Sequence, residues 1–327
     1  MTSKQIVCKN EAEGCEMKNI IMEGLRTLVA IIGAFYMSFL RFFVHAPLKS
    51  VKGEIVLVTG SGSGIGRQLV IEFSRLGAVV VLWDINEESN EETAQLVNAE
   101  GGTCHVYTCD VGSREEVYAV ADRVKTEVGD ISILVNNAGI VSGKKLLDCT
   151  EEMIERTFNV NLLAHFWTVK AFLPAMFEKN HGHIINMSSS CGVIGLNGLV
   201  DYSASKFGVV GFTEVLNYEI VFSGHSGVNT SLVCPMWVRT GMFEGCRLRF
   251  PALNSPLEVE AAVNRIMRGI LTNEHVICLP RTVYFFNVMR TFLPVEAMLE
   301  ILRFMGVSKF MNRFVGHQGV TTSRQTG

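Results

Sequence analysis

A glycine-rich loop between an apparent strand and an apparent helix is the feature that most constrains the fold. Residues 54–59, EIVLVT, have the continuous apolar character of a strand buried in a parallel sheet. The loop GSGSGIG at 60–66 follows, and residues 67–77 then have a helical pattern. Glycines let the backbone approach a pyrophosphate, and a helix N-terminus favours its negative charge. The spacing is TGxxxGxG from Thr59 to Gly66, and it predicts a dinucleotide-binding βα unit.

Further strands and helices alternate after this unit, which predicts an α/β fold with a doubly wound parallel sheet. Ligands of such sheets bind at the carboxyl ends of the strands. We take Val228–Cys234 as the last core strand. The earlier strands are predicted at 78–84, 103–110 and 131–135, and the helices between them at 87–100 and 113–128.

Asp84 ends the second strand, 24 residues after Gly60. A carboxylate at about this distance grips a ribose 2′-hydroxyl in dinucleotide-binding folds. Ile85 and Asn86 follow it, so no adjacent cation would accept a 2′-phosphate. The pattern favours NAD over NADP, and the alternative is a solvent-facing aspartate at the end of a strand.

Composition excludes several classes of protein. The chain has 327 residues, with 29 basic and 32 acidic side chains, and this balance gives no sign of nucleic-acid binding. A mean hydropathy of +0.27 requires a large core or contact with lipid. The nine cysteines are odd in number and form no CxxC pair, which predicts free thiols in a reducing compartment. His181 and His183 are interpreted as turn residues, and no metal site is predicted.

The N-terminal segment is the second region with a strong pattern. Residues 1–19 form a polar tail, and 20–46 form a hydrophobic segment. Its uncharged core, Thr27–Leu40, would span about 21 Å as a helix, against about 30 Å for the hydrocarbon core of a bilayer. Flanking Arg26 and Arg41 can snorkel to extend that reach. A membrane anchor, either spanning or lying in one leaflet, is favoured over a cleaved signal peptide or a buried core helix.

Residues 53–280 resemble the classical short-chain dehydrogenase/reductase family. The resemblance rests on TGxxxGIG at 59–66, NNAG at 136–139, Ser189 and Tyr202-x-x-x-Lys206, in the family's order and spacing. It implies one Rossmann-like domain with about seven strands. It also implies oxidation of a hydroxyl, or reduction of a carbonyl, that depends on a nicotinamide cofactor.

The family's catalytic roles carry over to four residues. Tyr202 would be the general acid/base, and the Lys206 cation, one helical turn later, would lower the pKa of its phenol. Ser189 would hydrogen-bond the reacting oxygen, and Asn161 would support a water relay. The residues that the resemblance places against NAD are Thr59, Gly60, Ser61, Ser63, Gly64, Ile65, Gly66, Asp84, Asp110, Val111, Asn137, Ala138, Gly139, Tyr202, Lys206, Pro235, Val238 and Thr240.

The segments after the last predicted strand are unusually apolar. Residues 241–257 should form the substrate loop, and their apolar side chains suit a lipid-like substrate, with simple packing of the loop as the alternative. Residues 281–316 form an apolar extension that suits a membrane interface, packing on the core or a dimer contact. Residues 317–327 are expected to be disordered. The apolar loop side chains are Met242, Phe243, Leu248, Phe250 and Leu253.

Within the family, the chain resembles the branch of membrane-bound retinol dehydrogenases of epidermal type and lipid-droplet hydroxysteroid dehydrogenases. The supporting stretches are GEIVLVTGSGSGIGR, LWDIN, NNAGIVSGKK, AHFWTVKAFLPAMFEKNHGHI and TGMFEG. The resemblance implies NAD-dependent oxidation of all-trans-retinol to retinal, or else of a steroid hydroxyl. It also implies a place at the endoplasmic reticulum membrane or a lipid droplet, and a homodimer or homotetramer. Free cysteines, and glycosylation sequons at 186–188 and 229–231 on predicted core strands, favour a catalytic domain that faces the cytosol.

Three other functions fit the sequence less well. A non-catalytic lipid-droplet coat protein would be expected to lose Ser189, Tyr202 or Lys206, all of which are present. A nucleotide-sugar epimerase has a different glycine spacing and a polar substrate domain. A reductase would be expected to carry basic residues near Asp84.

Overall fold

The computed structural model describes residues 3–43, 46–247, 249–250 and 255–316. The chain forms two compact units, which divide between Leu48 and Lys49. The expected disordered tail, 317–327, lies outside the described residues, as do Leu248 and Leu253 of the expected substrate loop.

The first unit contains one long helix, α1 (Ser3–Phe43), which begins well before the apolar segment. Its stretch Met17–Met37 has 21 residues, none of which is buried. At about 1.5 Å per residue that stretch is about 31 Å long, which matches the hydrocarbon core of a bilayer. The exposure of these apolar side chains argues against the alternative of a buried core helix. It supports membrane association. A second segment long and apolar enough to span, Glu151–Glu178, is half-buried within the other unit and belongs to its core.

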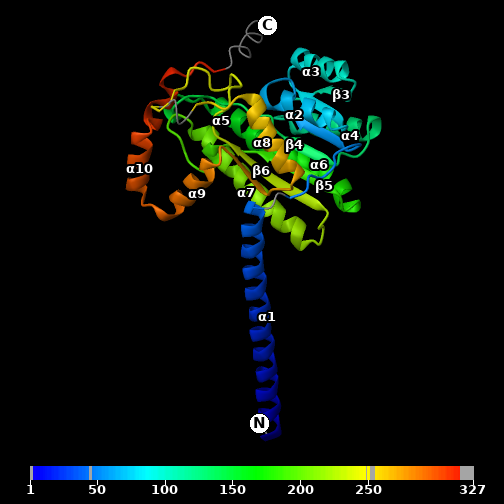
Figure 1. Ribbon diagram of the computed structural model, residues 1–327, viewed down its shortest axis with the longest axis vertical. Helices are drawn as coiled ribbons and strands as arrows, with labels where there is room; N and C mark the ends of the chain where they lie inside the picture. The colour runs from blue at the N-terminus through cyan, green and yellow to red at the C-terminus, as the bar shows by residue number, and fades with distance from the viewer. Residues whose placement is uncertain (1–2, 44–45, 248, 251–254, 317–327) are drawn as a thin grey trace. The chain divides into compact units, whose positions relative to one another are not determined.

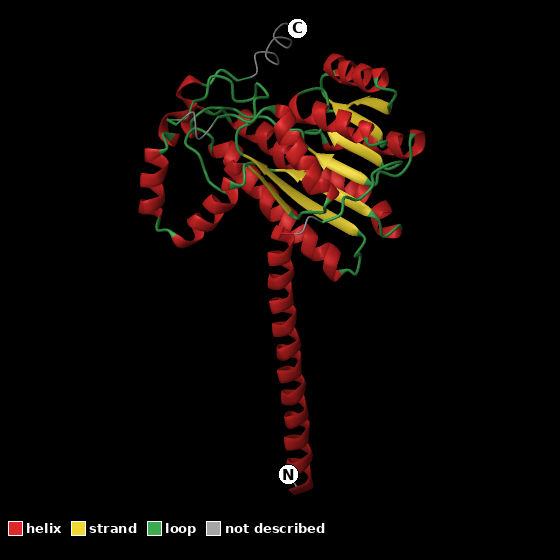
Figure 2. Cartoon of the chain, viewed as in Figure 1, coloured by secondary structure: helices red, strands yellow, loops and turns green. Residues whose placement is uncertain are grey.

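The second unit is built on a seven-stranded parallel sheet with helices on both faces (Figures 1 and 2). The strand order β3-β2-β1-β4-β5-β6-β7 reverses direction between β1 and β4, which is the doubly wound arrangement expected. The strands are β1 (Ile55–Thr59), β2 (Val79–Asp84), β3 (Thr103–Thr108), β4 (Ile133–Asn136), β5 (Gly182–Met187), β6 (Val228–Pro235) and β7 (Val276–Leu279).

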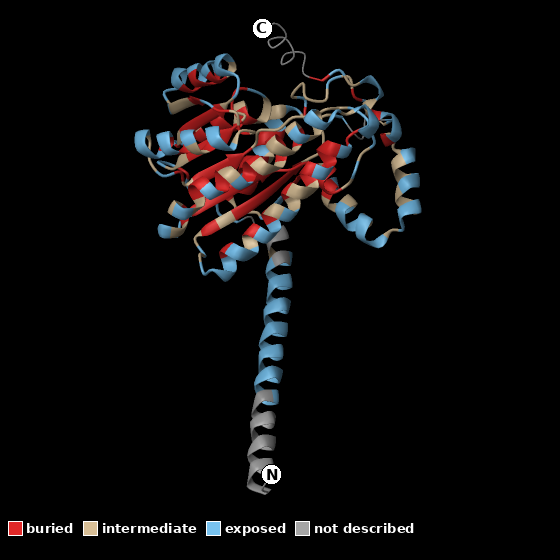
Figure 3. Cartoon of the chain, turned by 180° about the vertical axis from the view of Figure 1, so that it is seen from behind, coloured by how far each residue is buried: buried red, intermediate tan, exposed pale blue. Residues whose placement is uncertain are grey.

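Successive strand residues point to opposite faces, and each face has its own hydrophobic core. In β1, Val56 and Val58 pack under α2, α3 and α8, whereas Leu57 packs under α4, α6 and α7. Because both faces are covered, the central strands are buried along most of their length (Figure 3), whereas the edge strand β3 is only partly buried. These helices are α2 (Gly64–Arg75), α3 (Glu87–Ala99), α4 (Arg114–Glu127), α6 (Ala164–Glu178), α7 (Val200–Phe222) and α8 (Val259–Leu271).

Short polar side chains define where several helices begin. Asn86, Ser113 and Thr150 accept hydrogen bonds from backbone amides in the first turns of α3, α4 and α5. One turn of π-helix follows α5, and the extension after β7 is helical as well. These remaining elements are α5 (Glu151–Phe158), the π-turn η2 (Asn159–Leu163), α9 (Thr282–Phe292), α10 (Val295–Phe304) and the 3₁₀ segments η1 (Leu146–Asp148), η3 (Ser190–Gly192) and η4 (Val307–Arg313).

Two sequence interpretations were wrong. Val228–Cys234 is not the last core strand, because β7 pairs with it on the outer side. β4 is equally short, but the NNAG motif after it marks its end, whereas no motif follows β7. His183 is not a turn residue: it lies in β5 and is 1 % exposed. A histidine can enter the core here because its ring nitrogens have polar partners on both sides.

Lys49 donates a 2.7 Å hydrogen bond to Nδ1 of His183, whose Nε2 lies 2.8 Å from the Ser231 hydroxyl. Ser231 in turn donates to the backbone oxygen of Glu274. Because the Ser231 proton is used there, the imidazole donates from Nε2 and accepts at Nδ1. The first residue of the second unit is thus tied to the amino ends of β5 and β6.

Burial lowers the pKa of Lys49 to about 8 from its ordinary 10.5, with a smaller opposing effect of Glu54. Between these values the unfolded chain holds a proton that the folded chain has lost, so stability should rise as the pH increases from about 8 to about 10. Lys49→Met should remove part of this rise in the thermal midpoint, whereas Lys170→Met, at an exposed site, should keep it. Parallel midpoint curves for Lys49→Met and the unmodified protein would contradict the prediction.

Candidate active site

The glycine loop between β1 and α2 is shaped by close backbone contacts. Gly60 has φ +67°, a conformation that disfavours side chains, and a Cβ on Gly66 would lie 2.0 Å from the Gly60 oxygen. Ser63 precedes α2 without a side-chain hydrogen bond to the helix amides. The first turn of α2 can therefore offer its amides to an anion. Ser61, by contrast, donates a 2.7 Å bond to buried Asn90, so its side chain faces the core.

The Asp84 carboxylate lies against this loop at the carboxyl end of β2. It accepts hydrogen bonds from the amides of Gly62 at 2.8 Å and Asn86 at 2.9 Å. These bonds fix the carboxylate where the ribose of a dinucleotide would lie beside the loop. The residues therefore fit a dinucleotide with a free 2′-hydroxyl.

Arg67 is a residue that the sequence analysis missed. Its guanidinium binds the Gly62 carbonyl, the Ser89 carbonyl at 3.1 Å and the Glu92 carboxylate at 2.9 Å. Glu92 forms an ion pair with Arg67 and neutralises its positive charge. Arg67 therefore holds the loop in place, and the negative charge of Asp84 remains the charge beside the loop. Its position directly after GSGSGIG was the only available signal.

Asp110 lies just beyond β3, which ends at Thr108. Its carboxylate accepts from the Gly112 amide at 2.9 Å and forms a two-pronged ion pair with Arg156 of α5 at 2.8 and 3.0 Å. Neighbouring Val111 is 7 % exposed. Arg156 therefore holds the aspartate in place at the edge expected for the adenine, and no motif in the sequence indicated this pairing.

The NNAG segment after β4 is tied to the end of β1. The Thr59 hydroxyl accepts from the amides of Asn137 and Ala138, both at 3.0 Å. The side-chain amide of Asn137 donates back to the Thr59 carbonyl at 2.9 Å. Gly139 brings the chain towards the catalytic residues, because a Cβ there would lie 3.5 Å from Lys206 Nζ.

The segment after β6 closes the other side of the loop. A Cβ on Gly64 would lie 3.2 Å from the Thr240 side chain, so Thr240 lies beside the start of α2. Val238 is 6 % exposed and packs in the same core as partly buried Ile65. With Pro235 at the end of β6, the expected cofactor residues all lie around the carboxyl ends of the strands.

Tyr202 is buried in the first turn of α7, near three consecutive serines whose side chains have different partners. Ser188 donates to the Lys206 carbonyl at 2.8 Å, and Ser190 lines an apolar cavity. The Ser189 hydroxyl accepts from the Cys191 amide at 3.1 Å, and its interaction with the Tyr202 phenol lowers the pKa of that phenol. Of the three serines, Ser189 is thus placed to share a reacting oxygen with Tyr202.

The expected lowering of the Tyr202 pKa by Lys206 is not found in this geometry. Burial raises the pKa of Tyr202 well above its ordinary value of 10, and this effect outweighs the bond from Ser189. The Lys206 ammonium lies 5.8 Å from the centre of the Tyr202 ring and donates to the Met187 carbonyl at 2.8 Å. Burial also lowers the pKa of Lys206 to about 8, which weakens its hold on a positive charge.

Asn161 lies in the π-turn between α5 and α6 and is fully buried. Its side chain accepts from the Ile140 amide at 2.8 Å and donates to the Ile140 carbonyl at 2.9 Å. It also donates to Ser205, next to Lys206, at 3.1 Å. Asn161 therefore connects the NNAG segment to the catalytic helix.

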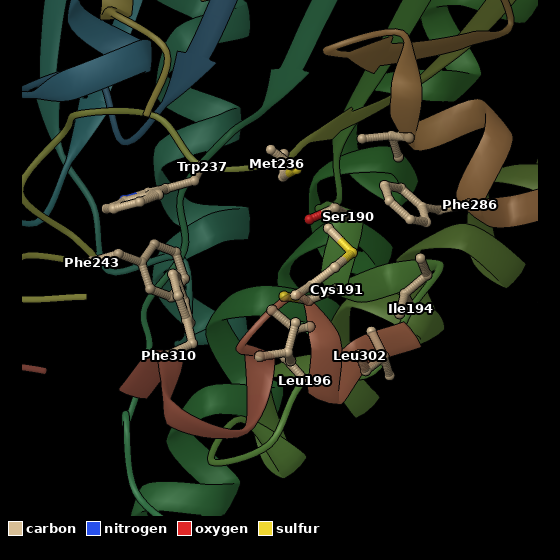
Figure 4. A pocket seen from close by; sticks show the side chains of 13 residues that line it. Ser190, Cys191, Ile194, Leu196, Met236, Trp237, Phe243, Phe286, Leu302 and Phe310 are labelled. Atoms are coloured by element: carbon tan, nitrogen blue, oxygen red, sulfur yellow. The ribbon is translucent and has the colours of Figure 1, made fainter. Parts of the chain in front are cut away.

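An apolar cavity is lined by Cys191, Phe243 and Phe310, among other residues (Figure 4). The Tyr202 ring meets Phe243 edge to face at 5.7 Å, and Phe243 and Cys191 both line the cavity. Its volume of about 70 Å³ is below the roughly 300 Å³ of common ligand sites, so a long ligand must displace wall side chains. The wall comes from three regions of the chain: Ser190, Cys191, Ile194 and Leu196; Met236, Trp237 and Phe243; and Val283, Phe286, Leu302, Met305, Val307 and Phe310.

The expected substrate loop contributes less to this wall than predicted, because only Phe243 of its described apolar residues lines the cavity. Phe250 instead packs on Phe304 at 5.2 Å. The extension after β7 supplies about half of the wall. Within the described residues, no cluster of three or more histidine, cysteine or acidic side chains is arranged to hold a metal.

Fold and site together define a nicotinamide-type oxidoreductase architecture, with a dinucleotide loop on one side of a Tyr–Lys–Ser set. Residues 54–249 match the short chain dehydrogenase family, and the chain belongs to that family. It is 46 % identical over 305 residues to epidermal retinol dehydrogenase 2 of Mus musculus, covering 92 % of this chain and 99 % of the relative. Human retinol dehydrogenase 10 is 45 % identical over 332 residues, with 93 % and 97 % covered.

Solved structures agree with the fold. A short chain dehydrogenase/reductase from Burkholderia phymatum, crystallised in complex with NAD, superposes with a TM-score of 0.69 at 25 % identity. The match covers 77 % of this chain and 97 % of the bacterial one. The expectation of a Rossmann-like sheet is therefore confirmed.

Proposed function

We propose that this protein oxidises all-trans-retinol to retinal with NAD. The observation that carries the proposal is the apolar cavity whose wall residues Cys191 and Phe243 pack against Tyr202, since it offers a lipophilic alcohol a place near the proton-transfer residues. Relatives named as retinol dehydrogenases, similar over more than nine-tenths of the chain, support this substrate. The glycine loop and Asp84 support NAD as the cofactor.

The residues of the chain would divide the work between proton transfer and positioning. Tyr202 would accept the hydroxyl proton as its phenolate, the form that its raised pKa disfavours in this geometry, and Ser189 would hold the same oxygen by a hydrogen bond. Lys206, fixed by the Met187 carbonyl, and Asn161, fixed by Ile140, would set the position of the site around the NNAG segment. When bound, NAD would supply the hydride acceptor. The apolar wall would exclude water from the reacting carbon.

A turnover comparison tests this function. Purified protein in phospholipid vesicles would receive retinol or a hydroxysteroid, each with NAD or NADP. We expect retinol with NAD to give the highest kcat/KM. Activity on steroids without activity on retinol would favour the hydroxysteroid dehydrogenase alternative, and a strong preference for NADP would contradict the role of Asp84.

The cavity gives a sharper prediction about substrate binding. Leu302→Trp adds a large side chain to the wall, so the KM for retinol should rise about tenfold with a smaller change in kcat, given overpacking costs of about 1–3 kcal/mol. Leu299→Trp, on the exposed side of the same helix, is the matched control and should leave KM within about twofold. Steady-state kinetics in detergent micelles would measure both, with thermal midpoints to confirm folding. Equal KM values for the two variants would count against this cavity as the substrate site.

The proposed location is the endoplasmic reticulum membrane or a lipid droplet, with the catalytic domain in the cytosol. The exposed apolar stretch Met17–Met37 supports membrane attachment. The seven cysteines of the second unit are all free, in keeping with a reducing compartment. Protease added to intact microsomes should digest the catalytic domain, whereas full protection would place it in the lumen.

A homodimer or homotetramer is also proposed. Exposed apolar side chains on α7, at Val215, Tyr218, Val221 and Phe222, support a contact between copies. Sedimentation in detergent should give the mass of two or four chains. A monomer at micromolar concentration would refute this assembly.

A further inference from the structure

A hollow lined by cationic side chains adjoins the apolar cavity. Its volume is about 820 Å³, and within the described part of the chain its lining includes no carboxylate. Phe310 lines both the hollow and the cavity, so one side chain separates a strongly basic site from a strongly apolar one. The five cationic side chains are Arg247, Arg249, Arg303, Lys309 and Arg313.

The helices beside the hollow expose apolar side chains on the side away from the cavity. On α9, Phe285, Val288 and Phe292 are 63, 55 and 80 % exposed, and their i, i+3 and i+7 spacing places them on one face. On α10, Val295 and Leu299 are also exposed. The adjoining positions Phe286, Leu302 and Met305 line the cavity, so the same two helices present apolar side chains both inwards and outwards.

Cations and exposed aromatic rings are in direct contact at the edge of the hollow. The Arg249 guanidinium lies 5.4 Å from the ring centres of both Phe250 and Phe304, and Phe304 is 63 % exposed. Arg303 pairs with Glu300 on its own helix. Side chains that combine a cation with an exposed ring suit the boundary between lipid headgroups and acyl chains.

We propose that the hollow binds the phosphate groups of anionic phospholipids, while the exposed side chains of α9 and α10 enter the outer acyl layer. Five cations complement an anionic headgroup region. The cations of the hollow could bind any phosphate. If that phosphate belonged to a soluble ligand, however, the adjoining apolar face of α9 and α10 would stay exposed to water. A bilayer surface satisfies both features at once. The Phe310 wall would then lie at the membrane, and a lipid-dissolved alcohol could enter the cavity without crossing water.

Hydrogen–deuterium exchange on the full chain in lipid nanodiscs tests the proposal. Discs of phosphatidylcholine alone would be compared with discs of equal parts phosphatidylcholine and phosphatidylserine. We expect residues 282–313 to exchange more slowly in the anionic discs. Lys309→Gln combined with Arg313→Gln should reduce this protection at least about tenfold, since each cation near an anionic surface contributes roughly a fivefold factor.

The matched control is Lys170→Gln combined with Arg268→Gln, which removes the same charge at exposed sites on α6 and α8. It should retain the protection. Equal exchange in both kinds of disc would overturn the proposal. So would protection in neutral discs by inorganic phosphate alone, which would assign the hollow to a soluble phosphate, or by polyglutamate alone, which would assign it to an acidic protein.

The entry of retinol from the membrane into the cavity rests on the proposed function, whereas binding of lipid headgroups does not. With anionic vesicles we expect a lower KM for retinol and an unchanged kcat. Because the exchange measurement uses no substrate, failure of headgroup binding and failure of retinol oxidation would be distinguished.

Discussion

Tyr202→Phe should lower kcat by about 10²–10⁴-fold while NAD still binds. The substitution removes one hydroxyl from a side chain that is 4 % exposed, so the packing around the ring is retained. What is lost is the group placed to take the proton, and general acid–base catalysis contributes rate factors of about this size. Stopped-flow absorbance of NADH formation would measure the rate, and quenching of protein fluorescence would measure NAD affinity.

Tyr218→Phe is the control for this prediction. Tyr218 lies on the same helix, is exposed and bonds only to nearby Glu214 at 2.9 Å among the described contacts. It should keep the activity of the unmodified protein. If Tyr202→Phe also kept that activity, Tyr202 would not be the proton acceptor, and the proposed chemistry would fail.

Gly66→Ala should disrupt the dinucleotide loop and weaken NAD binding about ten- to a hundredfold. The added Cβ would lie 2.0 Å from the Gly60 oxygen and 2.6 Å from Asn137 Nδ2. The first of these atoms is backbone and cannot rotate away, so the loop must move. Overpacking of this kind costs about 1–3 kcal/mol. Isothermal calorimetry with NAD and a thermal melt would measure the two effects.

Gly211→Ala is the matched control because no atom lies within 4 Å of a Cβ at that position. Gly211 is exposed inside α7, where alanine should stabilise the helix by about 0.5–1 kcal/mol. The two substitutions should therefore shift the thermal midpoint in opposite directions. Unchanged NAD affinity in Gly66→Ala would show that the loop does not hold the dinucleotide.

The fold could be predicted from the sequence because its signals are local. The apolar strands and the glycine loop are each contained in a few residues. β7 was missed because no motif marks its end, whereas the equally short β4 runs into NNAG. His183 was misplaced because its partners, Lys49 and Ser231, are distant in sequence.

The candidate site divides in the same way. Tyr202, Lys206 and Ser189 could be named from their spacing, but the direction of the Tyr202 pKa could not, because it depends on burial rather than on the helical turn between Tyr202 and Lys206. Arg67 and Arg156 were missed because each binds a residue that is distant in the sequence and close only in the folded chain. The cavity wall was predicted only in outline, since its three regions are far apart in the sequence.

The wall of the cavity comes from three separate parts of the chain, and this has a consequence for how new selectivities could arise. The residues proposed for proton transfer all lie at or before Lys206 in the sequence, whereas the helices after β7 supply much of the apolar wall. Exchanging the stretch after β7 between relatives should therefore change which alcohol is accepted and leave the proton chemistry intact. Substrate selectivity and catalytic chemistry could then change independently during evolution.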